Sequence, residues 1–191
     1  SGGANLVMDA LDGLDSVRSF TLSGLVELDD LLRDPGDASW DDFLTQGYDT
    51  QPGQILKVQW RGQTIGVMRR SPETLELLPD VDVNLRDPQS LESDQPPFAQ
   101  NGSRALKDEF LVVNMHCTHL GCVPQVVPEV GAQPFDDDWK GGFFCPCHKS
   151  KFDMAGRVYK GVPAPTNLRI PPYSYLDDRT LIIGVNPEGD V

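Results

Sequence analysis

Alternating apolar and polar residues mark several short strands along this chain. Residues 17–22 alternate in this way, as a half-buried strand does. Residues 55–60 and 63–69 form two such runs that are separated by only two residues, a spacing typical of a β-hairpin. Two apolar runs, residues 110–114 and 180–185, are short enough to be buried strands. The pattern therefore predicts many short strands joined by turns.

Helical periodicity is confined to the first half of the chain. A serine followed by a proline opens residues 71–78, a combination typical of a helix start. Residues 23–50 are acidic, and we expect them to form a surface insertion with two short helices, at 25–32 and 39–44. Helices would thus be minor elements of the fold.

The remaining segments predict irregular structure. Residues 80–107 are polar and proline-rich, and we expect a loop with at most a turn or two of helix. We also expect residues 123–140 to be irregular, with the acidic run 136–138 as a solvated loop rather than a calcium site. Residues 152–159 predict a hairpin that turns near Gly156. Short strands with frequent turns indicate an all-β antiparallel fold.

Composition narrows the choice of partners. The chain has 191 residues and a formal net charge of −13, which argues against nucleic acid as a partner. No apolar run in the sequence is long enough to span a bilayer as a helix. We therefore expect one medium-sized acidic domain, or a domain with a large insertion.

Two short motifs hold all four cysteines and two of the three histidines. The first runs from Cys117 to Cys122 and reads C-T-H-L-G-C; the second is residues 145–150 and reads C-P-C-H-K-S. A C-x-H pair and a C-x-x-H pair place two thiolates and two imidazoles together, which is the ligand set of a Rieske [2Fe–2S] centre. The pattern thus predicts a metal cluster.

Two other interpretations use the same residues. Structural zinc also accepts two Cys and two His, but it would give Cys122 and Cys147 no role. A scaffold of two disulfides would give the histidines no role. The third histidine, His116, is expected to be a packing or surface residue rather than a ligand.

The motifs closely resemble those of the Rieske iron–sulfur subunit of bacterial cytochrome bc-type complexes. The resemblance covers residues 51–185, is densest over 110–184, and includes K-G-V-P-A-P at 160–165, which resembles the proline loop of that family. It implies an antiparallel Rieske-type sandwich in which a small cluster-binding subdomain is inserted into a base domain.

The resemblance also implies residue roles. Cys117 and Cys145 would ligate one iron, and the other iron would be held by the two histidines, His119 and His148. Cys122 and Cys147 would form a disulfide that ties the two cluster loops together. Ser150 would donate a hydrogen bond to a bridging sulfide of the cluster.

Domain limits follow from the same resemblance. Residues 1–16 would be the remnant of a neck or linker. Residues 17–109 would form the first part of the base domain, with the atypical insertion at 23–50. Residues 110–165 would form the cluster-binding subdomain, and residues 166–191 would complete the base.

The implied function is electron transfer within a quinol–cytochrome c oxidoreductase. One [2Fe–2S] cluster per chain would accept an electron, together with a proton, from quinol at His148, and a c-type cytochrome would receive the electron. The implied partners are the cytochrome b and c-type cytochrome subunits. An N-terminal membrane helix, absent from this sequence, would hold the protein on the periplasmic side of the bacterial inner membrane, where a disulfide can form.

Two alternative functions use the same cluster. One is the Rieske subunit of an arsenite-oxidase-like enzyme, and the other is a soluble Rieske ferredoxin. The ferredoxin class usually lacks the extra cysteine pair, so Cys122 and Cys147 argue against it. The proline-rich run at 160–175 favours the bc-type function over both.

The chain departs from the family at three positions. Lys149 stands where glycine is usual, which would strain the backbone if φ is positive there, and its charge should favour reduction of the cluster. Phe152 stands where a tyrosine often donates a hydrogen bond to a ligand sulfur, and loss of that bond should lower the potential. Val162 lengthens the proline loop by one residue.

Overall fold

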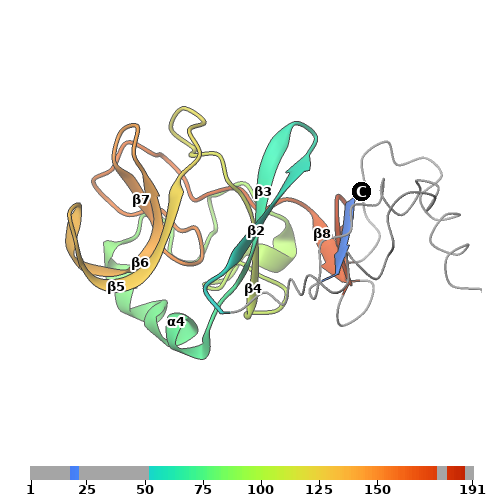
Figure 1. The fold of residues 1–191 in the computed structure, drawn as a ribbon, viewed down its shortest axis with the longest axis horizontal. Helices are drawn as coiled ribbons and strands as arrows, with labels where there is room; N and C mark the ends of the chain where they lie inside the picture. Colours follow the sequence, from blue (N-terminus) through green and yellow to red (C-terminus); the bar gives the residue numbers. More distant parts are fainter. Residues whose placement is uncertain (1–17, 22–51, 176–179, 188–191) are drawn as a thin grey trace, which may run out of the picture. The chain divides into compact units, whose positions relative to one another are not determined.

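The computed structural model describes residues 18–21, 52–175 and 180–187 (Figure 1). The chain divides into two compact units, one made of Ser1–Asp49 with Tyr173–Val191 and the other of Thr50–Pro172. The expected neck and the two expected acidic helices of residues 23–50 lie outside the described residues. The finer domain limits, including a subdomain at 110–165, stay a prediction.

The first unit contains a three-stranded antiparallel sheet. Its order is β1 (Arg18–Thr21), β9 (Thr180–Ile183) and β8 (Tyr173–Tyr175). The strands predicted at 17–22 and 180–185 are thereby confirmed, and the sequence pattern missed β8. Leu181 and Ile183 are fully buried on β9, as their alternation requires.

The second unit contains the predicted hairpin. β2 (Ile55–Trp60) pairs with β3 (Gln63–Arg69), and β3 pairs with β4 (Phe110–Asn114), all antiparallel. The connection is Arg61-Gly62, and both residues have positive φ, 49° and 72°. That conformation matches the right-handed twist of the two strands. All five residues of β4 are buried, so this strand is the core element that delivers the first motif.

A second sheet of this unit carries the other motif. β5 (Gln125–Gln133), β6 (Asp136–Cys145) and β7 (Ser150–Phe152) are antiparallel neighbours (Figure 1). The expectation of irregular structure at 123–140 is therefore wrong. Register shifts between Val127 and Val130 and between Gly131 and Gln133 break the alternation that would have revealed the strands.

The acidic run 136–138 also differs from the solvated loop that was expected. It begins β6, and the Asp136 carboxylate accepts a hydrogen bond from Lys151 Nζ at 2.5 Å, while Asp138 pairs with Lys140. The hydrogen bond from Lys151 offsets the cost of partial burial, and the pKa of Asp136 lies below its usual value. Asp136 and Asp138 therefore each form an ion pair with a lysine.

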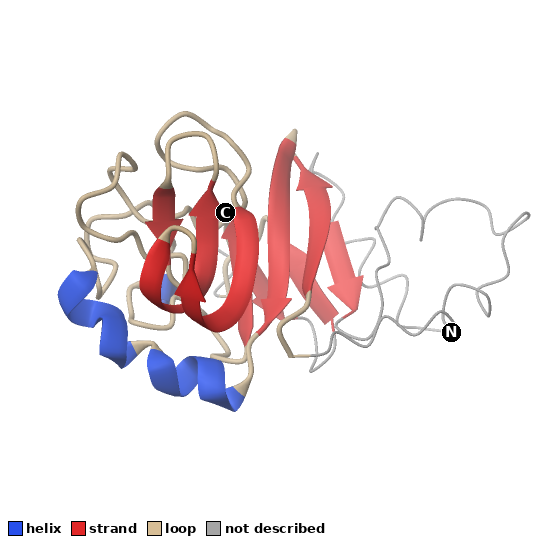
Figure 2. Ribbon diagram, turned by 60° about the vertical axis from the view of Figure 1, so that its left-hand side comes forward, coloured by secondary structure: helices blue, strands red, loops and turns tan. Residues whose placement is uncertain are grey.

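The helical elements lie where the turn residues predict them. α4 (Pro72–Leu77) is one of the helical segments drawn in blue in Figure 2. Ser71 caps it, because its hydroxyl accepts a hydrogen bond from the backbone N–H of Thr74. Short 3₁₀ segments, η1 (Pro79–Asn84) and η2 (Pro97–Ala99), interrupt the following loop, which confirms the expectation for residues 80–107. No helix among the described residues is long and apolar enough to cross a membrane.

Three buried arginines hold the turn that follows β7. Arg70 donates a hydrogen bond to Met154 O, and Arg104 donates to Ala155 O and Gly156 O. Arg157 donates to both carboxylate oxygens of Asp153, to one from its backbone N–H and to the other from its side-chain Nε. A bridge between Phe152 and Val158 closes this turn, so the predicted hairpin is short. Burial lowers the pKa of the Arg104 guanidinium to about 9. Charged donors thus satisfy carbonyls that the turn leaves unpaired.

The close approach of β6 to this turn yields a prediction about Gly142. A β-carbon at Gly142 would lie 2.0 Å from Phe152 O, and its φ is +148°. Gly142→Ala should therefore lower the free energy of unfolding by about 4 kcal/mol or more, or prevent folding. Gly102→Ala is the matched control, because its β-carbon would meet only Arg157 Nη1 at 3.6 Å. Chemical denaturation measures both; equal stability of the two variants would contradict the packing.

Candidate metal centre

The first motif forms a tight loop directly after β4. The backbone N–H of Cys117 donates to Cys122 O at 2.8 Å, and the N–H of Gly121 donates back to Cys117 O at 2.8 Å. Gly121 has a φ of +80°, which glycine adopts without strain. Cys117 is buried, whereas the Leu120 side chain is 71% exposed. The loop therefore turns its first thiol inward and its leucine outward.

The second motif connects β6 to β7. Cys145 and Ser150 are paired across the two strands, and the N–H of Lys149 donates to Cys145 O at 2.9 Å. Lys149 has a φ of +62°, a left-handed conformation that costs strain in a residue with a β-carbon, so the condition on which strain was expected here is met. Cys145 and Ser150 are buried, whereas His148 and Lys149 are exposed.

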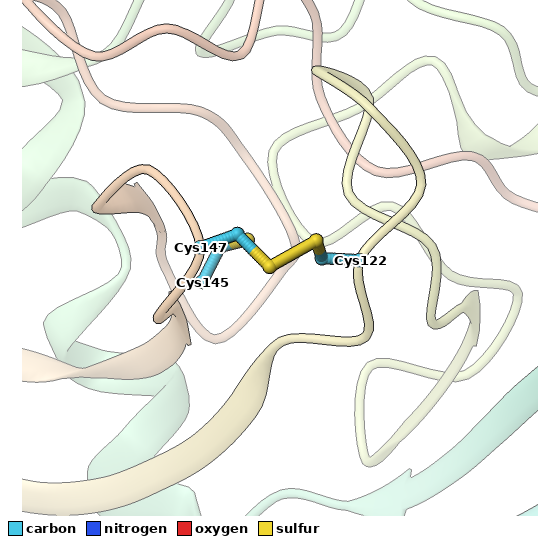
Figure 3. A group of neighbouring side chains, drawn as sticks. All are labelled: Cys122, Cys145 and Cys147. Carbon is cyan, nitrogen blue, oxygen red and sulfur yellow. A yellow bond between two sulfur atoms is a disulfide. The ribbon is translucent and has the colours of Figure 1, made fainter.

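A disulfide joins the two loops, as the resemblance implies. Cys122 and Cys147 are bonded with a Cα–Cα distance of 6.7 Å, and their sequence separation is 25. Figure 3 shows the bond with Cys145 beside Cys147, and the three sulfur atoms lie within 4.8 Å of one another. Because two of these sulfurs form the disulfide, this trio is not itself a ligand set.

The other four cysteine and histidine side chains of the motifs converge. Cys117 and Cys145 are free thiols, 3% and 2% exposed, close enough to share a hydrogen bond. The rings of His119 and His148 meet edge to face, with centroids 4.7 Å apart. His119 Nδ1 is buried without a hydrogen-bond partner among the described residues. A buried nitrogen of this kind is available to a metal.

The electrostatics of the thiols fit the same use. Burial raises the pKa of the Cys117 thiol, and the neighbouring Cys145 adds to this effect. Hydrogen bonds from the backbone of His119 and from Ser150 act in the opposite direction, because they favour the thiolate. A bound iron ion would supply the positive charge that two buried thiolates need. The residues present therefore fit an iron–sulfur cluster.

The proline loop, residues 160–165, is fixed to both motif loops. Thr118 Oγ1 donates to Thr166 O at 2.7 Å, and Ser150 Oγ accepts the backbone N–H of Ala164 at 3.0 Å. Arg86 Nη2 donates to Val162 O from the other side. The sequence interpretation included Ser150 but missed Thr118 and Ala164. The threonine stands inside the C-T-H motif, whereas a backbone N–H leaves no sequence signal.

His116 behaves as the sequence predicts. Its backbone N–H donates to Asn114 Oδ1, and its Nδ1 lies 2.9 Å from the same oxygen. The short contact between Asn114 Nδ2 and Gln63 Oε1 orients that amide. The His116 ring therefore packs against the Asn114 side chain, in agreement with the expected packing role; that His116 is not a ligand stays a prediction.

Fold and site together define a class of protein. This protein is a small antiparallel β protein in which two disulfide-linked loops bring together two buried thiols and two imidazoles. The family follows from sequence comparison: residues 45–173 match the model of the Rieske [2Fe–2S] domain. The chain belongs to this family, its cofactor is a [2Fe–2S] cluster, and the zinc alternative is thereby set aside.

Two curated relatives resemble this domain. The ubiquinol-cytochrome c reductase iron-sulfur subunit of Allochromatium vinosum is 52% identical over 134 residues, which cover 70% of this chain and 65% of that protein. The mitochondrial cytochrome b-c1 complex subunit Rieske of Solanum tuberosum is 42% identical over 135 residues, or 70% of this chain and 43% of that protein. The matched region is therefore less than two thirds of the length of either relative.

A solved chain of a hyperthermophilic respiratory Complex III is also similar. Its TM-score is 0.41 at 20% sequence identity, and the match covers 94% of this chain and 90% of that chain. A likeness at this level carries no functional argument.

Lys149 permits a test that separates backbone strain from charge. Lys149→Gly should raise the free energy of unfolding by about 1 kcal/mol, because the left-handed conformation costs a side chain roughly that much. Lys149→Gln keeps the β-carbon, so its stability should stay within about 0.5 kcal/mol of the original. Both variants remove a cation that has no ion pair within the described ranges, so both should lower the reduction potential alike.

Thermal unfolding, followed by circular dichroism, measures the change in stability. Protein-film voltammetry measures the change in reduction potential. If Lys149→Gly is no more stable than Lys149→Gln, the strain at this position is not what limits stability. If the potentials of the two variants differ, the charge alone does not account for the change.

Proposed function

We propose that this chain is the iron–sulfur subunit of a quinol–cytochrome c oxidoreductase. It accepts one electron and one proton from quinol and passes the electron to a c-type cytochrome. The observation that carries the proposal is the pair of disulfide-linked loops, with thiols buried beneath and His148 exposed at the tip. The similarity to a ubiquinol-cytochrome c reductase iron-sulfur subunit supports it.

The ligand assignment is the one that the resemblance to the Rieske family implies, and the contacts between the two thiols and between the two imidazole rings support it. Cys117 and Cys145 hold one iron, and His119 and His148 hold the other. When bound, the cluster supplies a one-electron acceptor whose potential, with two histidine ligands, falls between about −150 and +300 mV. Cys117 and Cys145 are buried, so the protein around them keeps water from the cysteine side of the centre. Ser150, fully buried, supports that side with a hydroxyl.

The exposed side of the site is suited to meeting quinol. The imidazole edge of His148 is accessible to a quinol oxygen and can accept its proton. Leu120 is 71% exposed beside it in the first loop, and Pro163 and Pro165 are exposed on the proline loop. We call Leu120, Pro163 and Pro165 the apolar rim. A hydrophobic substrate or the cytochrome b subunit can bind against this rim and exclude water from the contact.

Partners and location follow from the same proposal. The cytochrome b and c-type cytochrome subunits bind at the apolar rim and exchange electrons there. A membrane helix ahead of the described residues anchors the protein on the periplasmic side of the inner membrane. An oxidising periplasm agrees with the disulfide, and the net charge of −13 suits a basic cytochrome.

The two cysteine pairs should respond differently to substitution. Cys145→Ser removes a ligand, so the purified protein should lose most of its iron. The matched double variant Cys122→Ser/Cys147→Ser keeps all four ligands, so it should still assemble the cluster but lose it more readily than the original protein. Its free energy of unfolding should fall by about 3 kcal/mol, because the disulfide closes a loop of 25 residues.

Metal analysis, electron paramagnetic resonance of the reduced protein and thermal unfolding measure these outcomes. One zinc ion per chain, or an iron content unaffected by Cys145→Ser, would refute the ligand assignment. Treating the original protein with a mild disulfide reductant should reproduce the stability loss and leave the double variant unchanged.

The apolar rim can be tested in the assembled complex. Leu120→Asp places a charge at the proposed contact and should slow quinol-dependent cytochrome c reduction at least tenfold, with the cluster signal unchanged. Val130→Asp is the control, because Val130 is similarly exposed, at 57%, but lies on β5. Steady-state turnover with quinol measures both; equal rates in the two variants would argue against the rim as the docking surface.

A further inference from the structure

The Ser150 hydroxyl serves two groups at once. Its oxygen accepts a hydrogen bond from the backbone N–H of Ala164 at 3.0 Å, and the hydroxyl also lies within hydrogen-bond reach of the Cys117 sulfur. A hydroxyl has one hydrogen and two lone pairs, so one accepted bond leaves the hydrogen free for the sulfur. Ser150 is 0% exposed, and water therefore does not compete for either position.

We propose that the backbone N–H of Ala164 positions the Ser150 hydroxyl and thereby raises the reduction potential of the cluster. This inference rests on the ligand assignment proposed above. With the N–H in place, the single hydrogen of Ser150 points to a sulfur of the centre, where it stabilises the more negative reduced state. Without it, the hydroxyl can rotate and donate to a carbonyl instead.

The loop is built to present this one donor. Ala164 lies between Pro163 and Pro165, and neither proline has an N–H, so Ala164 carries the only backbone donor of the three. Its methyl group is 0% exposed, which fixes the peptide against the interior. The ring constraint on both neighbours limits how far that peptide can turn.

Contacts from outside the motif keep the loop in register. Arg86 Nη2 donates to Val162 O at 2.9 Å, and the Lys160 N–H donates to Asn84 O at 2.8 Å. Both contacts come from the segment at the end of η1, far from the motifs in sequence. Ala164 and, through the loop, Arg86 are thus positioning residues for Ser150.

The test is a double-mutant cycle on the reduction potential of the holoprotein. Ala164→Pro removes the N–H, whereas Ala164→Gly keeps it and removes only the methyl group. Ser150→Ala and Ala164→Pro should each make the cluster about tenfold harder to reduce, a shift of about 59 mV for a one-electron couple. Ala164→Pro should add nothing in the Ser150→Ala background, and Ala164→Gly should shift the potential much less than Ala164→Pro.

A second variant covers the case in which Ala164→Pro does not fold or load its cluster. Arg86→Met removes an anchor of the loop at a distance from the motifs, so it should lower the potential when Ser150 is present and leave it unchanged in the Ser150→Ala background. Additive shifts in either cycle would overturn the positioning role of the loop. An unchanged potential in Ser150→Ala alone would instead contradict the proposed contact between Ser150 and the centre.

Discussion

The bond between Cys122 and Cys147 is the constraint on which the site depends. The donor side chains come from two loops separated by a long stretch of chain, and each loop also exposes residues at its tip. Without a metal, the two buried thiols have no bond that links one loop to the other, so only noncovalent contacts would hold the donor atoms together. A covalent link removes that freedom without occupying any donor atom. It therefore keeps the two loops together when the cluster is absent.

The sheets beneath the loops must themselves be rigid for this to work. Gly142 lets β6 approach the turn after β7 more closely than any side chain would permit. That turn is held by buried arginines, whose charges would be costly to bury without partners. Arg157 meets Asp153 and Asp82, and the other two donate mainly to carbonyls. These hydrogen bonds fix the conformation of the turn, because moving any of the arginines would leave several buried polar groups without partners at once.

The sequence predicted the elements whose side chains repeat with a clear period, and it located the site because the ligand types are chemically specific. The hairpin of β2 and β3, the buried β4 and the cap at Ser71 were predicted in this way. β5 and β6 were missed because bulges shift the alternation by one residue. The bond from Ala164 to Ser150 was missed because backbone donors are the same at every residue except proline. At Lys149 the sequence predicted strain only on the condition that φ is positive, and the structure meets that condition.

Burial divides the residues of the centre into two groups with different consequences. Cys117, Cys145, Ser150 and Phe152 lie inside, where no solvent screens their interactions. Hydrogen bonds there have their full effect on the charge of the centre, so this group determines most of the potential. Leu120, His148 and Lys149 lie outside, where charge is screened and contact with another molecule is possible. The charge of Lys149 therefore acts on the centre only through solvent, which weakens its effect, whereas a molecule that excludes water from this surface would be affected by it more strongly.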